Sequence, residues 1–256
     1  MSATVGRLLL PGKVVFVTGA GSGLGRAICK CFAQEGATVI GGDVNKTAVD
    51  EVISSLRGMD NGKHLSVAVD VSSSEDVQSA LNRTMEAFSK PADAVVNSAG
   101  ITRDNLLFQM SEEDFDKVLS VNLKGTFLVN KIFGEAMVWH GIQGSIVNIS
   151  SIVAKNGNIG QSNYAASKAG VLALSSTVAK ELARHGIRVN SIIPGFIDTP
   201  MTEAVPDKVK DRIIPAIPLR RFGRPEEIAE VAAFLASDRS SYMTGAAVDV
   251  TGGLNL

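Results

Sequence analysis

Seven short runs of β-branched and other apolar residues alternate with longer stretches of helical periodicity along the 256 residues of the chain. Most of these runs are continuously apolar, which is typical of strands covered on both faces in a parallel sheet. The pattern predicts an α/β fold with a doubly wound, seven-stranded, mainly parallel sheet and helices on both faces. We expect strands at residues 14–18, 38–42, 65–70, 94–97, 145–150, 188–193 and 246–250.

No linker, repeat or low-complexity segment divides the chain, so we predict a single domain over residues 1–256. Local signals mark helix ends within it: Gly36 closes the first helical pattern, Ser73 or Ser74 opens another, and Pro225 opens the last. Residues from about 195 to 222 break the alternation and are too many for an ordinary connection. We expect this segment to form a functional flap over the substrate.

The chain carries 25 basic and 26 acidic side chains, a formal net charge of −1, and no basic stripe. This balance argues against nucleic acid as the main partner, and no apolar run approaches the roughly 18–20 residues that cross a bilayer. Cys29 and Cys31 are too few for a disulfide framework or a cysteine-built zinc site, and His64 and His140 lie apart, so we expect no metal. We expect a soluble protein of a reducing compartment. The first residues do not resemble a secretory signal, although a weak mitochondrial transit peptide stays open.

A glycine-rich turn, TGAGSGLG at residues 18–25, joins the first strand to the first helix. A strand, such a turn and a helix in that order direct free backbone N–H groups and the positive helix end at one point. Glycines there allow the tight turn, the approach of a pyrophosphate and the helix–strand contact of a Rossmann nucleotide-binding domain. The turn alone could be a sharp corner, but the acid described next favours a dinucleotide. The residues expected to contact it here are Gly19, Ser22, Gly23, Leu24 and Gly25.

Asp43 follows the second predicted strand, where a carboxylate can accept hydrogen bonds from both ribose hydroxyls. The carboxylate would repel a 2′-phosphate, and no Arg or Lys in the glycine turn offsets it, so we predict NAD rather than NADP. Lys46 lies beyond the strand, where a solvated charge at a helix entry is the simpler interpretation. Asp70 and Val71 are placed to meet the adenine, although Asp70 could instead cap the next helix.

Tyr164 and Lys168 stand four residues apart within YAASK and therefore share one helix face. A free phenol has a pKa of about 10, and a nearby cation, with the nicotinamide's own charge, brings that pKa towards the working range of an acid–base catalyst. Tyr164 could instead be a core aromatic and Lys168 a surface charge. Two residues favour the catalytic interpretation: Ser151 ends a strand thirteen residues earlier, and Asn122 opens a helical run after the loop that follows the fourth strand.

Ordered motifs extend over essentially the whole chain: TGAGSGLG, NSAG at residues 97–100, Asn122, Ser151 within NISS, YAASK at residues 164–168 and Pro194-Gly195. With this set the sequence resembles the short-chain dehydrogenase/reductase family. One departure is Ser98, which stands where the family usually has a second asparagine. We expect little loss, because the next two residues still allow the backbone to approach the cofactor.

The resemblance implies roles for four catalytic residues. Ser151 would hydrogen-bond the substrate oxygen, Tyr164 would exchange the proton, and Lys168 would hold the nicotinamide ribose and lower the pKa of the tyrosine. Asn122 would hold a water that links Lys168 to solvent. Ser150 competes with Ser151, but the offset of thirteen residues from Tyr164 favours Ser151. Further cofactor contacts implied by the resemblance are Asn97, Ala99, Gly100, Tyr164, Lys168, Pro194, Gly195, Ile197 and Thr199.

The stretches NLKGTFLV, SIVAKNGNIGQSNYAASKAGV and VTGGL are similar to one branch of the family, which joins 17-beta-hydroxysteroid dehydrogenases to 3-oxoacyl-(acyl-carrier-protein) reductases. This branch implies NAD-dependent interconversion of 3-hydroxyacyl and 3-oxoacyl thioesters in mitochondrial fatty-acid synthesis, with oxidation of the 17-beta-hydroxyl of estradiol-type steroids. It implies a homotetramer, or a tetramer mixed with a second, NADPH-using reductase subunit. The implied location is the mitochondrial matrix, with the cytoplasm as the alternative.

Two other functions stay open. One is a protein that is chiefly a steroid or retinoid alcohol dehydrogenase. The other is a structural NAD-binding subunit, against which the joint presence of Asn122, Ser151, Tyr164 and Lys168 speaks.

Several surfaces beside the predicted site are open to more than one interpretation. An acidic carrier protein needs basic docking residues. Residues 141–144 lack the arginine that the bacterial reductases have there, and the positive charge of Arg184, beside His185, also suits a helix end without any partner. We therefore expect this chain to bind a carrier protein weakly.

We expect subunit contacts from helices around residues 105–137 and from Ala169, Val171 and Leu172, and we interpret Trp139 as a packing residue. The apolar residues that could contact a lipid-like substrate, or simply pack in the core, are Ile152, Val153, Ile159, Met201, Ile213, Ile214, Ile217 and Leu219.

Overall fold

The computed structural model of the chain describes residues 8–56, 63–203 and 207–254. A transit peptide, left open by the sequence, would lie largely outside these residues. Within them, seven strands form one sheet in the order β3-β2-β1-β4-β5-β6-β7, and every neighbouring pair is parallel, as predicted. The strands are β1 (Val14–Thr18), β2 (Thr38–Asp43), β3 (Leu65–Ala68), β4 (Ala94–Asn97), β5 (Ser145–Ile149), β6 (Arg188–Pro194) and β7 (Ala247–Val250).

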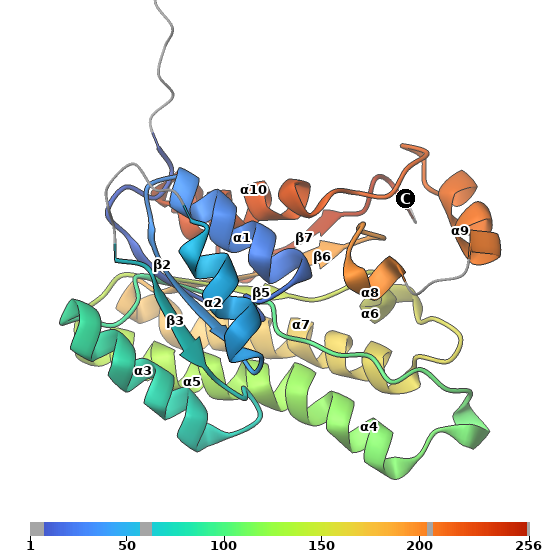
Figure 1. Cartoon of the computed structure of the whole chain (residues 1–256), viewed down its shortest axis with the longest axis horizontal. Coiled ribbons are helices and arrows are strands. Elements are labelled where there is room, and N and C mark those ends of the chain that lie inside the picture. Colours follow the sequence, from blue (N-terminus) through green and yellow to red (C-terminus); the bar gives the residue numbers. More distant parts are fainter. Residues whose placement is uncertain (1–7, 57–62, 204–206, 255–256) are drawn as a thin grey trace, which may run out of the picture.

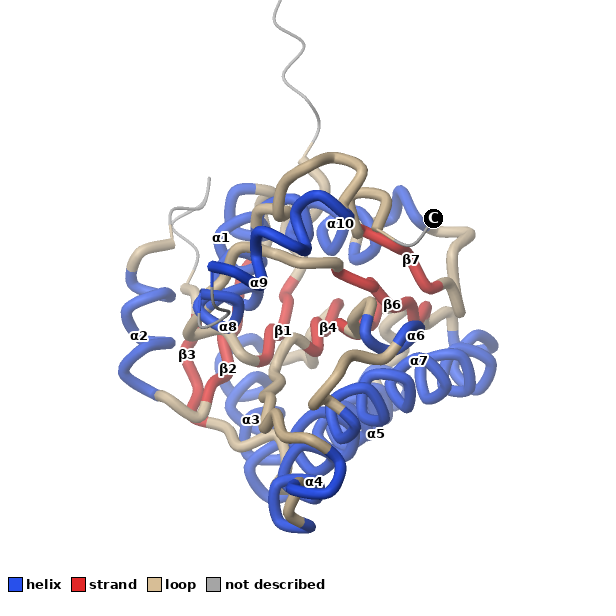
Figure 2. Tube along the Cα trace, turned by 90° about the vertical axis from the view of Figure 1, so that its right-hand side faces the viewer, coloured by secondary structure: helices blue, strands red, loops and turns tan. Residues whose placement is uncertain are grey.

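Helices cover both faces of the sheet, which Figures 1 and 2 show in two directions. One face carries α1 (Gly23–Gln34), α2 (Lys46–Ser54) and α10 (Pro225–Ala236), and the other α3 (Ser74–Phe88), α5 (Gly125–Trp139) and α7 (Ser162–Leu182). None of the described helices is long and apolar enough to cross a bilayer. The remaining helical segments are η1 (Leu107–Gln109), α4 (Glu112–Leu119), η2 (Ser120–Lys124), α6 (Val153–Asn156), η3 (Ala183–His185), α8 (Pro200–Glu203), α9 (Asp207–Ile213), η4 (Ile214–Ala216) and η5 (Asp238–Ser240).

Apolar side chains fill the space on both sides of the sheet, and the central strands β1, β4 and β5 are therefore buried at every residue. Val15 and Val17 of β1 pack with α1 and α10, whereas Phe16, the residue between them, packs on the opposite side. There its ring stacks on Phe133 of α5 with 4.4 Å between the ring centroids. The continuous apolar runs thus supply two cores, one per face.

The predicted helix ends follow from local chemistry. Ser73 precedes α3, and its hydroxyl accepts a hydrogen bond from the Asp76 N–H, which decides between the two candidate serines. Gly36 follows α1 with a φ of +86°, a conformation that favours glycine. Pro225 is the first residue of α10, where its missing N–H costs nothing.

The two edge strands depart from the burial on both faces that is expected of most strands: β3 has only Val67 buried, and the larger departure is in β7. Its burial alternates, with Ala247 and Asp249 exposed and Val248 and Val250 partly buried. β7 is the last strand in the sheet order, so it has a neighbour on one side only.

The expectation that Asn122 opens a helical run is also wrong. It lies in the π-helical turn η2, inside a helical run that continues from α4 into α5. The Thr126 hydroxyl donates to the Asn122 carbonyl oxygen at 2.7 Å, while the Asn122 side chain turns away to Ile101. Such single π turns recur at functional sites, since they redirect one side chain without ending the helix.

Candidate active site

The strand order reverses between β1 and β4, and ligands of open α/β sheets bind at such a point, beyond the carboxyl ends of the strands. The turns that follow these two strands touch there. Both Ser98 and Ala99 donate their backbone N–H to the Thr18 hydroxyl at 3.1 Å. A side chain at Gly19, whose φ is +67°, would lie 2.9 Å from the Ala99 backbone. Only glycine allows this approach.

The glycine turn fits a pyrophosphate. Ser22 precedes α1 in an extended conformation and makes no side-chain hydrogen bond to the helix, and no acid occupies the first turn. The first N–H groups of α1 and its positive end therefore stay available to an anion. Gly25 is required for the packing, because a Cβ there would lie 2.1 Å from the Gly19 carbonyl oxygen. Leu24, between these glycines, is partly buried.

The carboxylate of Asp43 lies beside this turn, as predicted. One of its oxygens accepts the Gly21 N–H and the other the Asn45 N–H, each at 2.9 Å. Lys46 forms an ion pair with Asp50 and donates to the Ser66 hydroxyl at 3.3 Å. Lys46 is therefore engaged on α2, and no described ion pair neutralises Asp43.

Asp70 organises the turn after β3. Its Oδ1 accepts hydrogen bonds from both the backbone and the hydroxyl of Ser72, at 2.9 and 2.6 Å, and these bonds lower the pKa of the carboxyl. The helix cap itself is Ser73, so Asp70 acts one turn earlier than the capping alternative supposed. Val71 is 6% exposed and packs against Gly125.

Other predicted cofactor residues end or follow β4 and β6. The Asn97 side chain is buried and donates to Asn130 and Asn148 at 2.7 and 2.8 Å, so its amide stabilises the core. In the flap, Ile197 and Thr199 both bond to Thr202. The Thr199 side chain lies 3.8 Å from the position of a Cβ on Gly23, and Pro194 and Gly195 lead into this segment from β6.

Ser151, Tyr164 and Lys168 come together at the carboxyl end of β5 and the first two turns of α7. Burial raises the pKa of the Tyr164 phenol, a hydrogen bond with the Ser151 side chain opposes that rise, and the charge of Asp104 adds to it. The Lys168 ammonium lies 5.7 Å from the centre of the tyrosine ring and donates to the Ile149 carbonyl oxygen at 2.9 Å. Burial lowers the pKa of Lys168 to about 8. Within the chain itself, burial therefore outweighs the Ser151 hydrogen bond, and the net pKa of Tyr164 is raised rather than lowered.

Asn122 and Gly100 stand next to this group. A Cβ on Gly100 would lie 3.4 Å from both the Asn122 side-chain oxygen and the Lys168 ammonium. Asn122 also donates to the Ser167 hydroxyl at 3.1 Å. Ser150, the competing serine, is buried and donates its hydroxyl to the Lys168 carbonyl oxygen at 2.8 Å, which leaves Ser151 as the serine beside the phenol.

Two contributors escaped the sequence analysis. The Ile149 carbonyl that holds Lys168 is a backbone group, which no sequence motif marks. Ser167 bridges Asn122 and the Tyr164 carbonyl oxygen. Its place within YAASK, three residues after Tyr164, was the available signal.

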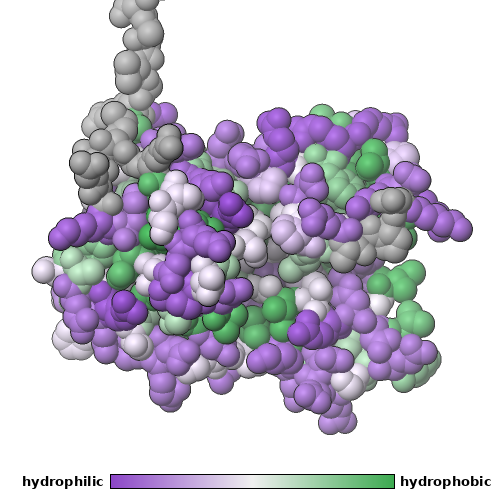
Figure 3. Space-filling view, viewed as in Figure 1, coloured by the Kyte–Doolittle hydropathy of each residue, from purple (hydrophilic) through white to green (hydrophobic). Residues whose placement is uncertain are grey.

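The apolar residues proposed for the substrate differ in burial, and two of them, Ile213 and Ile214, are partly buried. Ile152 and Val153 are buried in a small core with Ile193, and Ile217 is 1% exposed, so these pack inside the protein. The exposed apolar residues include three that the sequence analysis missed, and Figure 3 shows hydrophobic surface at the right-hand edge of the molecule, beside the loop before α4. The three missed residues are Leu106, Leu107 and Phe108, and the exposed residues among those proposed for the substrate are Ile159, Met201 and Leu219.

Two expectations about surfaces are wrong. Val171 is fully buried within the chain, so it cannot contact another subunit. Trp139 ends α5 but is 80% exposed, and it does not pack within the described part of the chain as expected. Arg184 is exposed, and its Nε donates to the neighbouring His185 at 3.0 Å.

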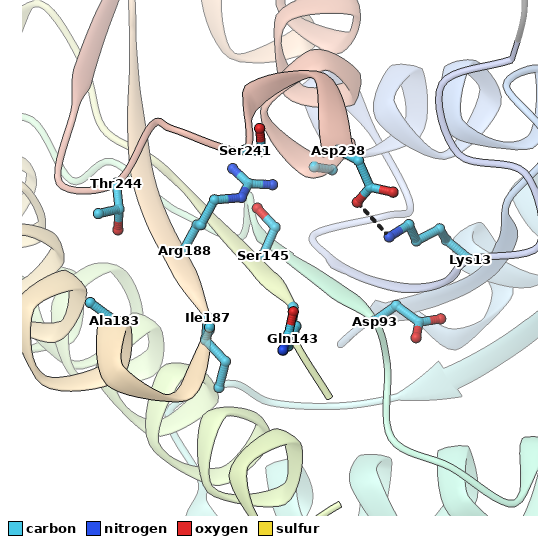
Figure 4. A pocket seen from close by; sticks show the side chains of 13 residues that line it. Lys13, Asp93, Gln143, Ser145, Ala183, Ile187, Arg188, Asp238, Ser241 and Thr244 are labelled. Carbon is cyan, nitrogen blue, oxygen red and sulfur yellow. Dashed lines mark hydrogen bonds and ion pairs between the residues drawn. The ribbon is translucent and has the colours of Figure 1, made fainter. Parts of the chain in front are cut away.

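A cavity of about 340 Å³ lies away from these residues, at the amino ends of the strands (Figure 4). Lys13 and Asp93 precede β1 and β4, and Arg188 begins β6; all three line it. Lys13 forms an ion pair with Asp238 at 2.8 Å. Arg188 donates to the Ser237 carbonyl oxygen and the Ser240 hydroxyl, at 3.0 and 2.9 Å, which fastens the end of α10 to the sheet. These contacts give the cavity walls a structural role.

Known proteins match the chain in sequence and in structure. A family model described as enoyl-(acyl carrier protein) reductase matches residues 19–255. Human (3R)-3-hydroxyacyl-CoA dehydrogenase is 51% identical over 251 residues, which cover 96% of each chain. A 3-oxoacyl-(acyl-carrier-protein) reductase from Thermotoga maritima is 49% identical over 245 residues, covering 96% of this chain and 98% of the reductase. A short-chain type dehydrogenase/reductase from Mycobacterium marinum superposes with a TM-score of 0.91 at 33% identity, over 99% of both chains. By fold, by motifs and by these likenesses, the chain belongs to the short-chain dehydrogenase/reductase family of oxidoreductases.

Proposed function

We propose that this protein is an NAD-dependent oxidoreductase that interconverts 3-hydroxyacyl and 3-oxoacyl thioesters. The observation that carries the proposal is the grouping of Ser151, Tyr164 and Lys168 beside a turn suited to a dinucleotide. The relatives support the substrate class, since one is named a 3-hydroxyacyl-CoA dehydrogenase and another a 3-oxoacyl reductase. The two names describe opposite directions of the same alcohol–ketone conversion.

Each residue has a defined task in this proposal. In oxidation the substrate alcohol loses a hydride from its carbon and a proton from its oxygen, and bound NAD would supply the acceptor for the hydride. The Ser151 hydroxyl holds the alcohol oxygen, and the phenol oxygen of Tyr164 receives the proton. Lys168 holds the nicotinamide ribose, and Asn122 holds a water through which the proton reaches solvent. Reduction reverses the proton transfer at the same oxygen atoms.

The rates of oxidation and reduction should depend on pH in opposite ways, because both depend on the ionisation of Tyr164. Tyr164 must be ionised to take a proton, and burial raises its pKa while the Ser151 hydrogen bond lowers it. The ammonium of Lys168 and the positive charge of a bound nicotinamide would lower it further. We therefore expect oxidation to accelerate as the pH rises, and reduction to slow.

Asp43 supports NAD as the cofactor. Its carboxylate flanks the glycine turn and lacks a cationic partner among the described ion pairs. A 2′-phosphate brought to this place would meet an uncompensated negative charge, whereas the 2′-hydroxyl of NAD would find an acceptor.

The exposed apolar residues support a lipid-like substrate. Ile159 is 88% exposed and Leu107 70% exposed, and the loops that carry them meet where Asn105 donates its N–H to the Gly160 carbonyl oxygen at 2.8 Å. An acyl chain or a steroid could cover this surface, so oxidation of a steroid 17-beta-hydroxyl is our second candidate activity.

We also propose a tetramer, homomeric or mixed with a second reductase subunit, in the mitochondrial matrix. Exposed Phe127 and Trp139 on α5 support subunit contacts.

A steady-state comparison tests the function. The purified protein is given a (3R)-3-hydroxyacyl-CoA or estradiol, each with NAD and with NADP, and light scattering reports its mass. We expect the highest kcat/KM with the thioester and NAD. Activity restricted to NADP would overturn the cofactor assignment. Activity with estradiol alone would replace the proposed substrate class, and inactivity with both would favour a structural subunit.

A further inference from the structure

Residues 101–105, between β4 and η1, are hydrogen-bonded to η2 and to residues at and just before the start of α7; we call this segment the strap. Asn122 accepts the Ile101 N–H and donates to the Ile101 carbonyl oxygen, at 2.8 and 3.0 Å. Further along, Gln161 donates to the Asp104 carboxylate at 2.8 Å, and the Asn105 N–H bonds to the carbonyl of the residue before Gln161 at 2.8 Å. The strap therefore borders the site over its full length.

Asn163 is the central tie between the strap and α7. It is fully buried, and its amide donates to the Arg103 carbonyl oxygen at 2.8 Å. The same nitrogen also lies 3.4 Å from the Asp114 carbonyl oxygen and 3.3 Å from the Met110 sulfur. One side chain thus joins α7, the strap and α4. Its oxygen accepts the backbone N–H of Tyr164 at 2.7 Å.

Both backbone polar groups of Tyr164 are consequently held by residues that also hold the strap. On the N–H side, Asn163 connects Tyr164 to Arg103. On the carbonyl side, the Ser167 hydroxyl donates to Tyr164 at 2.7 Å and accepts from Asn122, which binds Ile101. The residue before α7, Gln161, makes no side-chain cap, so Asn163 supplies an acceptor that this helix start otherwise lacks.

We propose that Asn163 is a positioning residue that fixes the backbone of Tyr164 and the strap as one unit and thereby keeps the phenol against Ser151. The inference rests on the proposed role of Tyr164 as the proton-exchanging group. It assigns Asn163 no contact with substrate or cofactor. Loss of its amide would let the start of α7 move relative to the end of β5, where Ser151 lies.

The groups that face the phenol determine the expected pH signature. Burial has the largest effect and raises the pKa of Tyr164, the Ser151 hydrogen bond lowers it, and Asp104 on the strap raises it to a smaller extent; the Lys168 ammonium lies on the next turn of α7. Loosening Asn163 separates the phenol from Ser151 and weakens this hydrogen bond, which is the one effect among the three that lowers the pKa. The pKa of Tyr164 should therefore rise, and alcohol oxidation should need a higher pH.

The test compares Asn163→Ala and Asn163→Ser with Asn190→Ala in the full-length protein. Asn190 is a matched control: it is also fully buried, donates to the Met243 carbonyl oxygen at 2.8 Å and accepts the Ala246 N–H at 3.0 Å, but it lies in β6 away from the phenol. Thermal melts identify a temperature at which all variants are folded. Steady-state oxidation of a 3-hydroxyacyl-CoA is then measured across pH.

We expect Asn163→Ala to lower kcat at least tenfold, with the KM for NAD within twofold of the native value. In a plot of kcat against pH, the rising part for alcohol oxidation (the pH limb) should move to higher pH by about half a unit to one unit, which is the equivalent of one lost hydrogen bond. Asn163→Ser, which keeps a hydroxyl donor and acceptor, should recover part of kcat. Asn190→Ala should leave both kcat and the pH limb unchanged.

Three results would overturn the inference: a native kcat and pH limb in folded Asn163→Ala, an equal loss in Asn190→Ala, or no recovery in Asn163→Ser. Should both Asn163 variants fail to fold, Gln161→Ala breaks the outer tie of the same strap. It should shift the pH limb in the same direction by a smaller amount, and an unmoved limb would refute the inference. Full activity of Tyr164→Phe would instead refute the proposed function, which separates the two failures.

Discussion

Lys168 is the side chain whose burial is hardest to explain by stability. It is 5% exposed, and burial is the sole cause of its lowered pKa, about 8 against an ordinary 10.5. Its ammonium donates to a neutral carbonyl, that of Ile149, rather than to a carboxylate. Holding this charge in the folded protein at pH 7 costs about 3 kcal/mol, judged from the displacement of the pKa. Such a cost is understandable where the cation serves chemistry.

This cost predicts that Lys168→Met loses activity without losing stability. We expect at least a hundredfold drop in kcat, and at pH 7 a Tm no lower than that of the native protein. The folded pKa lies below the unfolded one, so between about pH 8 and 10.5 the unfolded chain binds more protons and native stability rises with pH. Melting both proteins from pH 7 to 10 checks this: the advantage of the variant should shrink as the pH rises. A variant that is less stable by a constant amount would contradict it.

The charge of Asp43 should decide the cofactor. Asp43→Asn keeps the size of the side chain but removes the charge and one acceptor beside Gly21. We expect kcat/KM with NADP to rise about tenfold, worth about 1.4 kcal/mol, and kcat/KM with NAD to fall. Asp238→Asn removes a carboxylate that pairs with Lys13 at the amino edge of the sheet, and it should change neither value. An unchanged ratio of NAD to NADP in Asp43→Asn would refute the charge argument.

At the junction of β1 and α1, the first turn of the helix has no room for a side chain at Gly25. Gly25→Ala would place a methyl group 2.1 Å from the Gly19 carbonyl oxygen, and because that atom is backbone, α1 itself must move. We expect a loss of about 1–3 kcal/mol in the free energy of unfolding and a larger loss of NAD binding. In Gly134→Ala of α5 the methyl group would be 3.3 Å from the flexible end of Leu182, so this control should bind NAD normally. Calorimetry and cofactor titration measure both effects; unimpaired NAD binding in Gly25→Ala would show that the turn does not hold the cofactor.

Patterns that are local in sequence predicted the elements well. Each strand was placed within two residues of its observed ends, because apolar runs and strand-ending polar residues are local signals. The π turn at Asn122 was missed, since the helical periodicity of its neighbours continues through it. The burial of Val171 and the exposure of Trp139 were missed because periodicity does not say which neighbour covers a helix face. The ties made by Asn163 join segments about 50 and 60 residues apart, and no local pattern contains them.

The sheet as a unit separates two kinds of polar residue. At its carboxyl edge lie the glycine turn, Asp43 and the Ser151–Tyr164–Lys168 group, where loops from several strands meet. At its amino edge, Lys13 and Arg188 hold the end of α10 and line a cavity with structural walls. Because all seven strands are parallel, their carboxyl ends share one edge, and this arrangement gathers catalytic residues that are far apart in sequence.

The most direct test is whether the Tyr164 phenol exchanges a proton at this edge of the sheet. Tyr164→Phe is given a 3-hydroxyacyl-CoA and NAD, and the absorbance of the reduced cofactor reports hydride transfer. The variant removes one hydroxyl beside Ser151 and leaves the glycine turn and Asp43 untouched. We expect native folding and NAD affinity with a rate at least about a hundredfold lower, the usual contribution of a general acid–base group. A folded Tyr164→Phe protein that binds NAD and turns over at the native rate would show that the phenol carries no proton in this reaction.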